Sequence, residues 1–506
     1  MDTKLELQSI SKGAIYSFLG NGAGALLEYI FILIIARISG AESVGLYFLM
    51  VVIITVISII TRLGLSEGTL RFVSIYNGKK DLAKAKGVYL FSMELVFIFS
   101  LCLSLLLFIN ARYLAGILDR PGTEIIIKTF ALGLPFVSLF KISMSLFQAL
   151  HEMKYIALLQ GFFLPFSMSI IYLLLSLIWQ DFVSVGVAFT VAYLLFSIIA
   201  WRCSIKLLGV GIAENYQGVG KLARYSLPMA LVSLIMLTYG QLDIIILGWF
   251  KGAIEVGVLG VIFKLSFLCL AVSASVNYIF APLVADLHHR KEIDKLALIF
   301  KSITRWTITL TLPIYFVILM NSWAVLRFFG KDYLLGMLPL FILCTGNLVD
   351  VGTGLVATIL AMTGRNFLTL FNALLFLAIN IILDVILIPK YGIIGAAVGP
   401  AVSLTMVNLI RLIQVYKQFK IHPYSLRLAI PAGMAVIMFL VIVISKAAFN
   451  VGKVGVVMSI IYSLIGLLIY FSVIAFTVHA DDKEIFKYFM RRALGKTTNL
   501  WLEYFR

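Results

Sequence analysis

The sequence predicts an all-α polytopic membrane protein, and three observations lead to this fold class. Hydrophobic residues make up 62% of the 506 residues and charged residues only 13%, with a mean hydropathy of +1.06. A soluble domain is about one quarter charged, so this chain has too little polar surface to face water on all sides. Apolar runs of about 20 residues, the length that crosses a bilayer as a helix, recur along the chain. These runs, such as 49–60, do not alternate apolar and polar residues as barrel strands do.

Fourteen apolar runs are predicted to be transmembrane helices. In chain order they cover 13–36, 44–65, 87–109, 125–150, 156–178, 183–208, 223–249, 256–279, 299–320, 335–362, 367–388, 392–416, 426–445 and 454–477. The residues before the first run are too polar for a secretory signal, so we expect the first helix to be retained. No predicted loop is long enough to hold an inserted soluble domain.

The net charge of +17 is explained by topology. With alternating sides and a cytoplasmic N-terminus, 27 Lys and Arg fall on the inner side and 9 on the outer side. Cytoplasmic segments of membrane proteins carry such an excess of Lys and Arg. We therefore expect both termini in the cytoplasm, a multi-pass protein of the cytoplasmic (inner) membrane and no nucleic-acid partner.

The sequence shows no pattern of a cofactor or metal site. The cysteines lie in or at the edges of predicted spans, without metal-ligand or redox spacing, and are interpreted as small buried apolar residues. Neither a Gly-rich phosphate loop nor a Ser/His/Asp set is apparent. The sequence thus predicts no cofactor, no metal and no enzymatic activity.

One short motif occurs twice, at equivalent places in the order of spans. GAESVGLYF, at 40–48, lies between spans 1 and 2, and GAIEVGVLG, at 252–260, lies between spans 7 and 8. A second pair, SVGVA at 184–188 and IIGAA at 393–397, opens spans 6 and 12. Because the offsets of 212 and 209 residues agree closely, spans 1–6 and 7–12 are interpreted as two copies of one unit.

The repeat predicts the domain organisation. Six spans bring each copy back to its starting side, so the copies are parallel and related by a pseudo-two-fold axis along the membrane normal. We expect an N-terminal lobe (1–210), a C-terminal lobe (211–420), two additional helices (421–480) and a cytoplasmic amphipathic tail (481–506). Two such lobes around a central cleft are typical of a transporter that works by alternating access.

Four stretches carry a family resemblance: IARISGAESVGLYFL (35–49), LARYSLPMAL (222–231), QLDIIILGWFKGAIEVGVLG (241–260) and NIILDVILIPKYGIIGAAVG (380–399). They are similar to Wzx-type polysaccharide-export flippases of the multidrug/oligosaccharidyl-lipid/polysaccharide transporter superfamily. The similarity covers nearly the whole chain.

The resemblance implies a function in polysaccharide biosynthesis. A lipid-diphosphate-linked oligosaccharide, carried on undecaprenyl diphosphate or a similar polyprenyl lipid, would be moved across the cytoplasmic membrane. Spans 1, 2, 7 and 8 would line the central cleft, and the two extra spans would help to accommodate the lipid tail. Coupling to H⁺ or Na⁺ and association with other polysaccharide-assembly proteins are left open.

Ten charged side chains lie inside the predicted spans, where each costs at least about 2.5–3.5 kcal/mol and needs a partner, water or a function. They are Glu28, Arg62, Glu94, Lys128, Lys141, Asp243, Lys264, Arg305, Asp350 and Asp384. Five are acidic and five basic, so internal pairing is the simplest explanation of the set.

Several of these charges are candidates for a partly cationic substrate site. Lys141, Lys264 and Arg305 would suit a diphosphate or an acidic sugar. Asp243 lies at a depth similar to that of Lys264, and a short turn joins their spans. A structural ion pair and a substrate or coupling site both explain that placement.

Two carboxylates and one amide complete the candidate set. Glu28, at a similar depth in span 1, is a candidate for both substrate binding and ion coupling. Asp350, in mid-span beside glycines, is the other candidate for proton or sodium coupling. Asn21 lies in the glycine-rich run 20–24, where close helix packing is the default interpretation and a substrate contact the sharper one.

Three of the four remaining charges are interpreted as peripheral. Arg62 and Lys128 are expected to reach the lipid headgroups along their own stems. Asp384, near the outer end of span 11, is expected to end a helix and to face water.

Two other interpretations stay open. A lipid II flippase or an ion-coupled multidrug antiporter would share this architecture and differ in cargo. A membrane polysaccharide polymerase is less compatible with the sequence, because such an enzyme needs a carboxylate-bearing extramembrane segment and every predicted loop here is short.

Overall fold

The computed structural model describes residues 22–117, 123–178, 183–209, 219–237 and 241–425, together with a few separate residues between 428 and 472. All regular secondary structure in these stretches is helical. A helix satisfies its backbone hydrogen bonds internally, as the bilayer interior requires.

The described helices confirm the predicted fold class. Ten of them, counted with their continuous extensions, are long and apolar enough to cross a membrane. The chain is therefore an all-α multi-pass membrane protein. The tail and most of spans 13 and 14 lie outside the described residues, so the count of fourteen helices stays a prediction.

The chain packs as two compact units, Met1–Gly257 and Val258–Arg506. Their boundary falls inside a helix, α12, whose first turns pack with the first unit. The boundaries at 210 and 420 refer to the sequence repeat rather than to packing, and they stay predictions.

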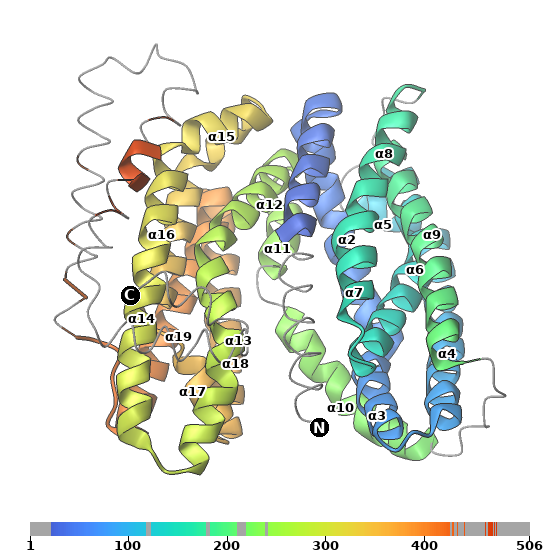
Figure 1. Ribbon diagram of the computed structural model, residues 1–506. Coiled ribbons are helices and arrows are strands. Elements are labelled where there is room, and N and C mark those ends of the chain that lie inside the picture. The colour runs from blue at the N-terminus through green and yellow to red at the C-terminus, as the bar shows by residue number, and fades with distance from the viewer. Residues whose placement is uncertain are drawn as a thin grey trace. The chain divides into compact units, whose positions relative to one another are not determined.

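The first unit is a bundle of long helices with shorter pieces at their ends (Figure 1). A helix over 22–38 is followed by α2 (Gly40–Arg62), α3 (Leu65–Gly78), α4 (Leu82–Ile109), α5 (Ala111–Ile117), α6 (Glu124–Ala149), α7 (Met153–Tyr155), the π-helix η2 (Ile156–Phe163), α8 (Leu164–Ser176), α9 (Val183–Leu208), α10 (Val219–Leu237), α11 (Leu242–Phe250) and the start of α12 (Ala253–Phe267). Helix α6 lies at the centre of the bundle and packs against α2, α3, α4 and α9. Fully buried Tyr89 and Ile142 belong to the core between α4 and α6.

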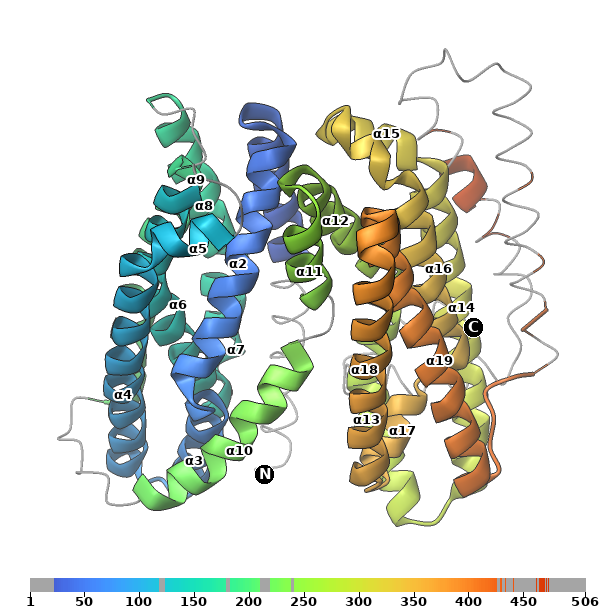
Figure 2. The same cartoon turned by 180° about the vertical axis from the view of Figure 1, so that it is seen from behind.

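The second unit has its own core and contains the rest of α12. After α12 come the 3₁₀ turn η3 (Leu268–Leu270), α13 (Ala271–His289), α14 (Ile293–Met320), α15 (Ser322–Phe329), the 3₁₀ turn η4 (Asp332–Gly336), α16 (Met337–Thr353), α17 (Val356–Met362), α18 (Asn366–Tyr391) and α19 (Ile393–Phe419). Helix α19 packs against α16, α17 and α18 (Figure 2). Buried Tyr470, from predicted span 14, donates a hydrogen bond to the Thr309 carbonyl on α14 at 2.8 Å.

Several predicted spans are interrupted, and each interruption has a local cause. Span 2 continues past a left-handed pair, Leu63 (φ 49°) and Gly64 (φ 71°), into the helix α3, which the sequence did not predict. Span 10 breaks at Gly354 (φ 72°), a conformation that favours glycine, and resumes as α17.

Left-handed residues recur at one offset and support the internal repeat. Lys80 (φ 59°), before α4, has its counterpart in Lys291 (φ 60°), before α14, 211 positions later. Gly209 (φ 82°), after α9, and Lys420 (φ 59°), after α19, are also 211 positions apart. These offsets agree with the 209 and 212 of the sequence motifs, although lysine has no intrinsic preference for this conformation.

Candidate functional site

The predicted site residues divide between the two units. The first unit contains Glu28, Lys141 and Asp243, the second contains Lys264, Arg305 and Asp350, and Asn21 lies outside the described residues. Each unit is therefore described by itself, and a shared central cleft stays a prediction.

Lys141 on α6 is the central cation of the first unit. Its ammonium donates one hydrogen bond, a long one of 3.4 Å, to the side-chain oxygen of Gln160. Among the residues that the structure describes, no carboxylate forms a salt bridge with Lys141, although its side chain is half-buried. Two N–H groups of this ammonium are thus available to an anionic or polar ligand.

A second cation acts on Lys141, and the sequence interpretation missed it. The Arg62 guanidinium and the Glu28 carboxylate are the two charged groups whose fields reach the Lys141 ammonium. Arg62 donates from Nε to the Ser58 carbonyl at 3.0 Å and from Nη1 to the Ser66 hydroxyl at 2.9 Å. The expectation that Arg62 reaches the lipid headgroups is therefore wrong, because neighbouring serines hold its guanidinium inside the unit.

The break between α2 and α3 explains why Arg62 lies there. Arg62 is the last residue of α2, directly before the left-handed pair, and the hydrogen bond to Ser66 crosses the break. At Gly64 a Cβ atom would overlap the Ser226 carbonyl oxygen of α10. Only glycine lets α10 approach the chain this closely, so the kink and the crossing helix fix the position of Arg62 together.

Glu28, from the helix over 22–38, is the acidic residue that interacts electrostatically with Lys141. Its carboxylate acts electrostatically on Lys141 and on two tyrosines, Tyr47 and Tyr193. Tyr47 is buried within a cluster of aromatic rings, with the Phe31 ring centroid 5.4 Å away. Glu28 thus interacts with a cation and with two phenol groups, and its predicted parts in substrate binding and coupling stay predictions.

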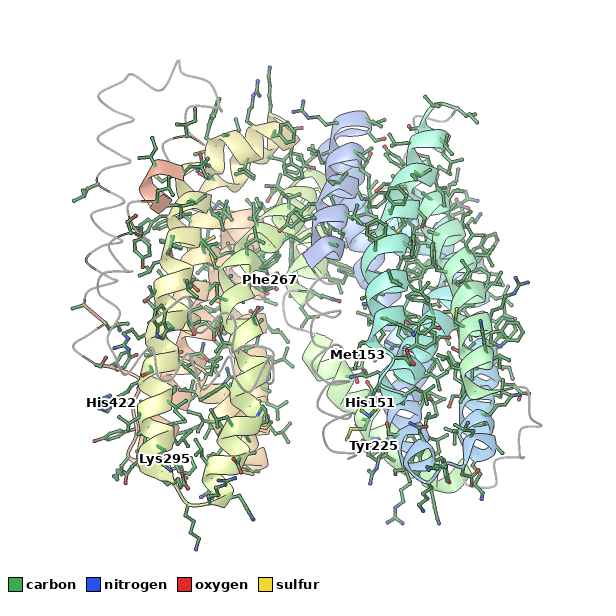
Figure 3. The ribbon with its side chains drawn as sticks, viewed as in Figure 1. His151, Met153, Tyr225, Phe267, Lys295 and His422 are labelled. Atoms are coloured by element: carbon green, nitrogen blue, oxygen red, sulfur yellow. The ribbon has the colours of Figure 1, made fainter. Side chains whose placement is uncertain are left out.

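Two further charged residues, Glu67 and Arg71, lie on α3 and interact with side chains of α10. The Glu67 carboxylate acts on Arg62 and accepts a hydrogen bond from the Ser233 hydroxyl at 2.8 Å. One turn further, the Arg71 guanidinium lies 4.2 Å from the centroid of the Tyr225 ring. Figure 3 shows Tyr225 and His151 towards the same end of this unit, the end that carries α3. We call Glu28, Lys141, Arg62 and Glu67 the polar track of the first unit.

The second unit holds a relay of polar side chains that includes Asp350. Its Oδ1 atom accepts a hydrogen bond of 2.5 Å from the Asn408 amide on α19. The Asn408 oxygen accepts one of 2.9 Å from the Arg411 guanidinium. On the same helix, Gln414 exchanges hydrogen bonds of 2.7 and 3.0 Å with Asn372 of α18. Asp350 is therefore tied to a cation through one amide, and its predicted ion coupling stays a prediction.

The remaining predicted residues lie on three helices. Lys264 on α12 and Arg305 on α14 are half-buried, whereas Asp243 on α11 is fully buried. Because Asp243 and Lys264 belong to different units, the predicted ion pair between them stays a prediction.

The expectation for Asp384 is wrong. Its side chain on α18 is fully buried, and one carboxylate oxygen accepts a hydrogen bond from the Asn380 amide at 2.7 Å. The other oxygen lies where a Cβ atom of Gly399 on α19 would be, so a glycine makes room for it. The position near a span end had suggested contact with water, but the packing of α18 on α19 encloses the carboxylate.

The described residues contain no group of three or more His, Cys, Asp and Glu side chains that could hold a metal ion. The arrangement in the first unit instead offers unpaired N–H donors on two neighbouring cations. Such donors suit an anion with several oxygens, a phosphate group above all.

Comparison with known proteins places the chain in a family. The family described as "Polysaccharide biosynthesis protein" matches residues 10–288, more than half of the chain. An uncharacterized membrane protein of Methanocaldococcus jannaschii is 24% identical over 419 residues, 79% of this chain and 97% of the relative. A probable low-salt glycan biosynthesis flippase of Haloferax volcanii is 24% identical over 410 residues, 78% of this chain and 81% of the relative.

The fold has a counterpart among solved structures. The lipid II flippase MurJ, in an inward closed conformation, superposes with a TM-score of 0.69 at 16% identity, covering 91% of this chain and 98% of that one. This likeness concerns the fold alone.

Proposed function

Since the chain belongs to the polysaccharide biosynthesis protein family, we propose that it is a flippase for lipid-diphosphate-linked oligosaccharide. Its cargo is a polysaccharide repeat unit on undecaprenyl diphosphate or a similar polyprenyl carrier. The relative from Haloferax volcanii, a probable glycan biosynthesis flippase, supports this class of activity. The protein acts as a transporter rather than as an enzyme.

One observation carries the proposal: Lys141 and Arg62, two cations of the first unit that interact electrostatically, form no salt bridge among the described residues. Burying a cation that has no carboxylate in salt-bridge contact is costly, and repulsion between two cations adds to that cost. A diphosphate brings two or more negative charges and many acceptor oxygens, so its binding would offset that cost.

The rest of the cycle follows from the predicted two-lobed architecture. The diphosphate binds the polar track of the first unit, and Lys264 and Arg305 contribute from the second unit. The lobes then expose the bound headgroup to the opposite leaflet while the polyprenyl tail stays among membrane lipids. Both termini lie in the cytoplasm and the protein in the cytoplasmic membrane, as the distribution of Lys and Arg indicates.

Purified protein in liposomes tests the proposal. The vesicles carry undecaprenyl diphosphate linked to a fluorescent glycan, and a membrane-impermeant quencher reports the fraction left in the inner leaflet. Wild-type protein is expected to expose this fraction to the quencher, and Lys141→Met to lower the rate by about tenfold or more, the effect of 1.4 kcal/mol in binding. Lys141→Arg keeps the charge and should keep part of the rate.

A matched control separates this role from a general need for lysine. Lys128 also lies on α6, but its ammonium is paired with Glu124 at 2.6 Å. Lys128→Met should leave the rate near that of wild type. A wild-type protein that moves cationic dyes but no lipid-linked glycan would show a multidrug antiporter, and one that lengthens the glycan would show a polymerase.

A further inference from the structure

Gln160 is the only described side chain that hydrogen-bonds to the Lys141 ammonium, and it lies in an unusual piece of backbone. Residues Ile156–Phe163 form the π-helix η2, in which the Leu164 N–H donates to the Leu159 carbonyl, five residues earlier. A π-helical turn is costly and often marks a functional position.

The cause of this π-helical turn is Pro165, the residue after Leu164. Pro165 has no N–H and cannot donate to the Gly161 carbonyl, four residues earlier, so the regular α-helical pattern cannot continue through this point. The Gly161 carbonyl oxygen instead faces the helix over 22–38, where a Cβ atom on Gly24 would come within 2.6 Å of it. Two glycines therefore allow the two backbones to touch.

This backbone contact brings two polar groups to Lys141. Glu28 is four residues after Gly24 and lies on the same face of its helix, whereas Gln160 directly precedes Gly161. The Lys141 ammonium donates a hydrogen bond of 3.4 Å to the Gln160 oxygen and interacts electrostatically with the Glu28 carboxylate. The Gly24–Gly161 contact thus sets the spacing of the three side chains.

The orientation of the Gln160 amide follows from the chemistry of lysine. An ammonium only donates hydrogen bonds, so Gln160 must turn its oxygen towards Lys141 and its NH₂ group away from it. In the part of the chain that the structure describes, no protein atom accepts a hydrogen bond from this NH₂ group, and Gln160 is only half-buried. The two N–H groups of the neutral Gln160 amide are therefore available to a ligand beside the Lys141 ammonium.

We propose that Gln160 is a specificity-determining residue, whose amide donates to the sugar joined to the diphosphate while Lys141 holds the phosphate. This inference rests on the proposed function. A phosphate oxygen and the hydroxyl or amide oxygen of the first sugar lie next to one another in such a substrate, as the ammonium and the amide do here. A site that hydrogen-bonds a substrate oxygen discriminates strongly against an analogue without it, because its own polar group is then left unpaired.

The test compares two lipid probes in the same vesicles: undecaprenyl diphosphate alone, and undecaprenyl diphosphate that carries one N-acetylated hexose. Wild-type protein should move the glycosylated probe at least about tenfold faster. Gln160→Met keeps the length of the side chain but removes the donors, and it should bring the two rates to within about twofold by slowing the glycosylated probe only. Lys141→Met should slow both probes, because both carry the diphosphate.

The remaining variants keep the outcomes distinct. Gln148→Met, at an exposed position near the end of α6, is the matched control and should keep the wild-type preference. Thermal unfolding of each purified variant shows whether it folds. An unchanged preference in Gln160→Met would overturn the inference, and so would an equal loss for both probes, which would make Gln160 only a support for Lys141. If wild-type protein moves neither probe, the proposed function itself fails.

Discussion

Gly45 and Gly257 contact one another through a reciprocal pair of close approaches. A Cβ atom on Gly45 would overlap the carbonyl oxygen of Ala253, and a Cβ atom on Gly257 would overlap that of Ala41. Ala41 and Gly45 belong to the first copy of the repeated motif, and Ala253 and Gly257 are the same positions of the second copy. All four residues belong to the first packing unit.

Such reciprocity is the sign of a local two-fold relationship, in which each segment presents the same surface to its equivalent. Alanine and glycine four residues apart form a flat helix surface, so two backbones can approach closely within a membrane. The two copies of this motif thus pack against each other through equivalent positions.

The first prediction concerns this contact. Gly45→Ala and Gly257→Ala should each destabilise the protein, by about 1–3 kcal/mol as other overpacked sites do, because the added methyl group meets backbone that cannot turn aside. Gly352→Ala on α16 is the matched control, since nothing lies within 4 Å of its Cβ position. It should be neutral or stabilising by about 0.5–1 kcal/mol, the usual gain of Ala over Gly within a helix. Unfolding of the purified variants in detergent measures both, and equal effects at the three positions would contradict the contact.

Much of the fold could be predicted from the sequence because the bilayer demands long apolar helices. The repeat was visible because its two copies share a packing surface. The breaks were less visible: Leu63 and Gly64 lie at the end of a predicted span, and the crossing of α10 at Gly64 explains the kink.

The site was only partly predictable for a related reason. The free-energy cost of burying its charge identifies Lys141 as a residue that needs a partner. Its depth along one helix does not show which residues of other helices surround it. Arg62 lies near a predicted span end and was expected to reach the lipid headgroups, but its guanidinium donates a hydrogen bond to Ser66 beyond the kink. Gln160 carries no charge and gave no signal, since its importance comes from a π-helical turn that depends on Pro165 and Gly24 together.

The second prediction concerns the relay in the second unit. Asn408→Ala removes the amide that joins Asp350 to Arg411 and should destabilise the protein by about 1.5–3 kcal/mol, the range for a hydrogen bond to a charged group. Asn110→Ala is the control, because the Asn110 amide bonds only to the Leu106 carbonyl of its own helix and is exposed. Chemical denaturation in detergent measures the difference.

The third prediction decides whether Asp350 couples transport to an ion. Asp350→Asn keeps the shape of the side chain and its position beside Asn408 but cannot release a proton or offer a full charge to a cation. If Asp350 couples transport, this variant should lose the response of liposome transport to an imposed H⁺ or Na⁺ gradient while downhill movement persists. A gradient response equal to that of wild type would leave Asp350 with a structural role.

The fourth prediction is a pH dependence at the start of α4. Asp81 caps this helix: its carboxylate accepts from the Lys84 N–H at 3.0 Å and from the Lys84 ammonium at 2.9 Å. These bonds hold the pKa of Asp81 below its usual value. A lowered pKa means that the stabilisation is complete above the ordinary aspartate pKa of about 4 and disappears as pH falls through the lowered value.

Amide hydrogen exchange in the first turn of α4 measures this effect. Protection there, corrected for the intrinsic exchange rate, should fall with acid in wild-type protein, whereas Asp81→Asn should show a flat profile over the same range. Glu292 and Lys295 repeat the pair before α14, with their charged atoms 2.7 Å apart. Exchange at α14 provides an internal comparison, since it should not respond to the substitution at Asp81.

The last prediction concerns Lys264, which the sequence places at the depth of Asp243. If Lys264 contacts the diphosphate, its ammonium acts as a point charge, so Lys264→Ala should abolish glycan transport at normal protein abundance and Lys264→Arg should keep part of it. If Lys264 only balances Asp243, removing one partner leaves a buried charge alone and should harm the protein more than removing both. Transport by the double variant Asp243→Ala, Lys264→Ala separates the two cases. We expect continued failure with normal abundance, because the diphosphate still lacks its cation. Restored transport would refute substrate contact and leave a structural ion pair.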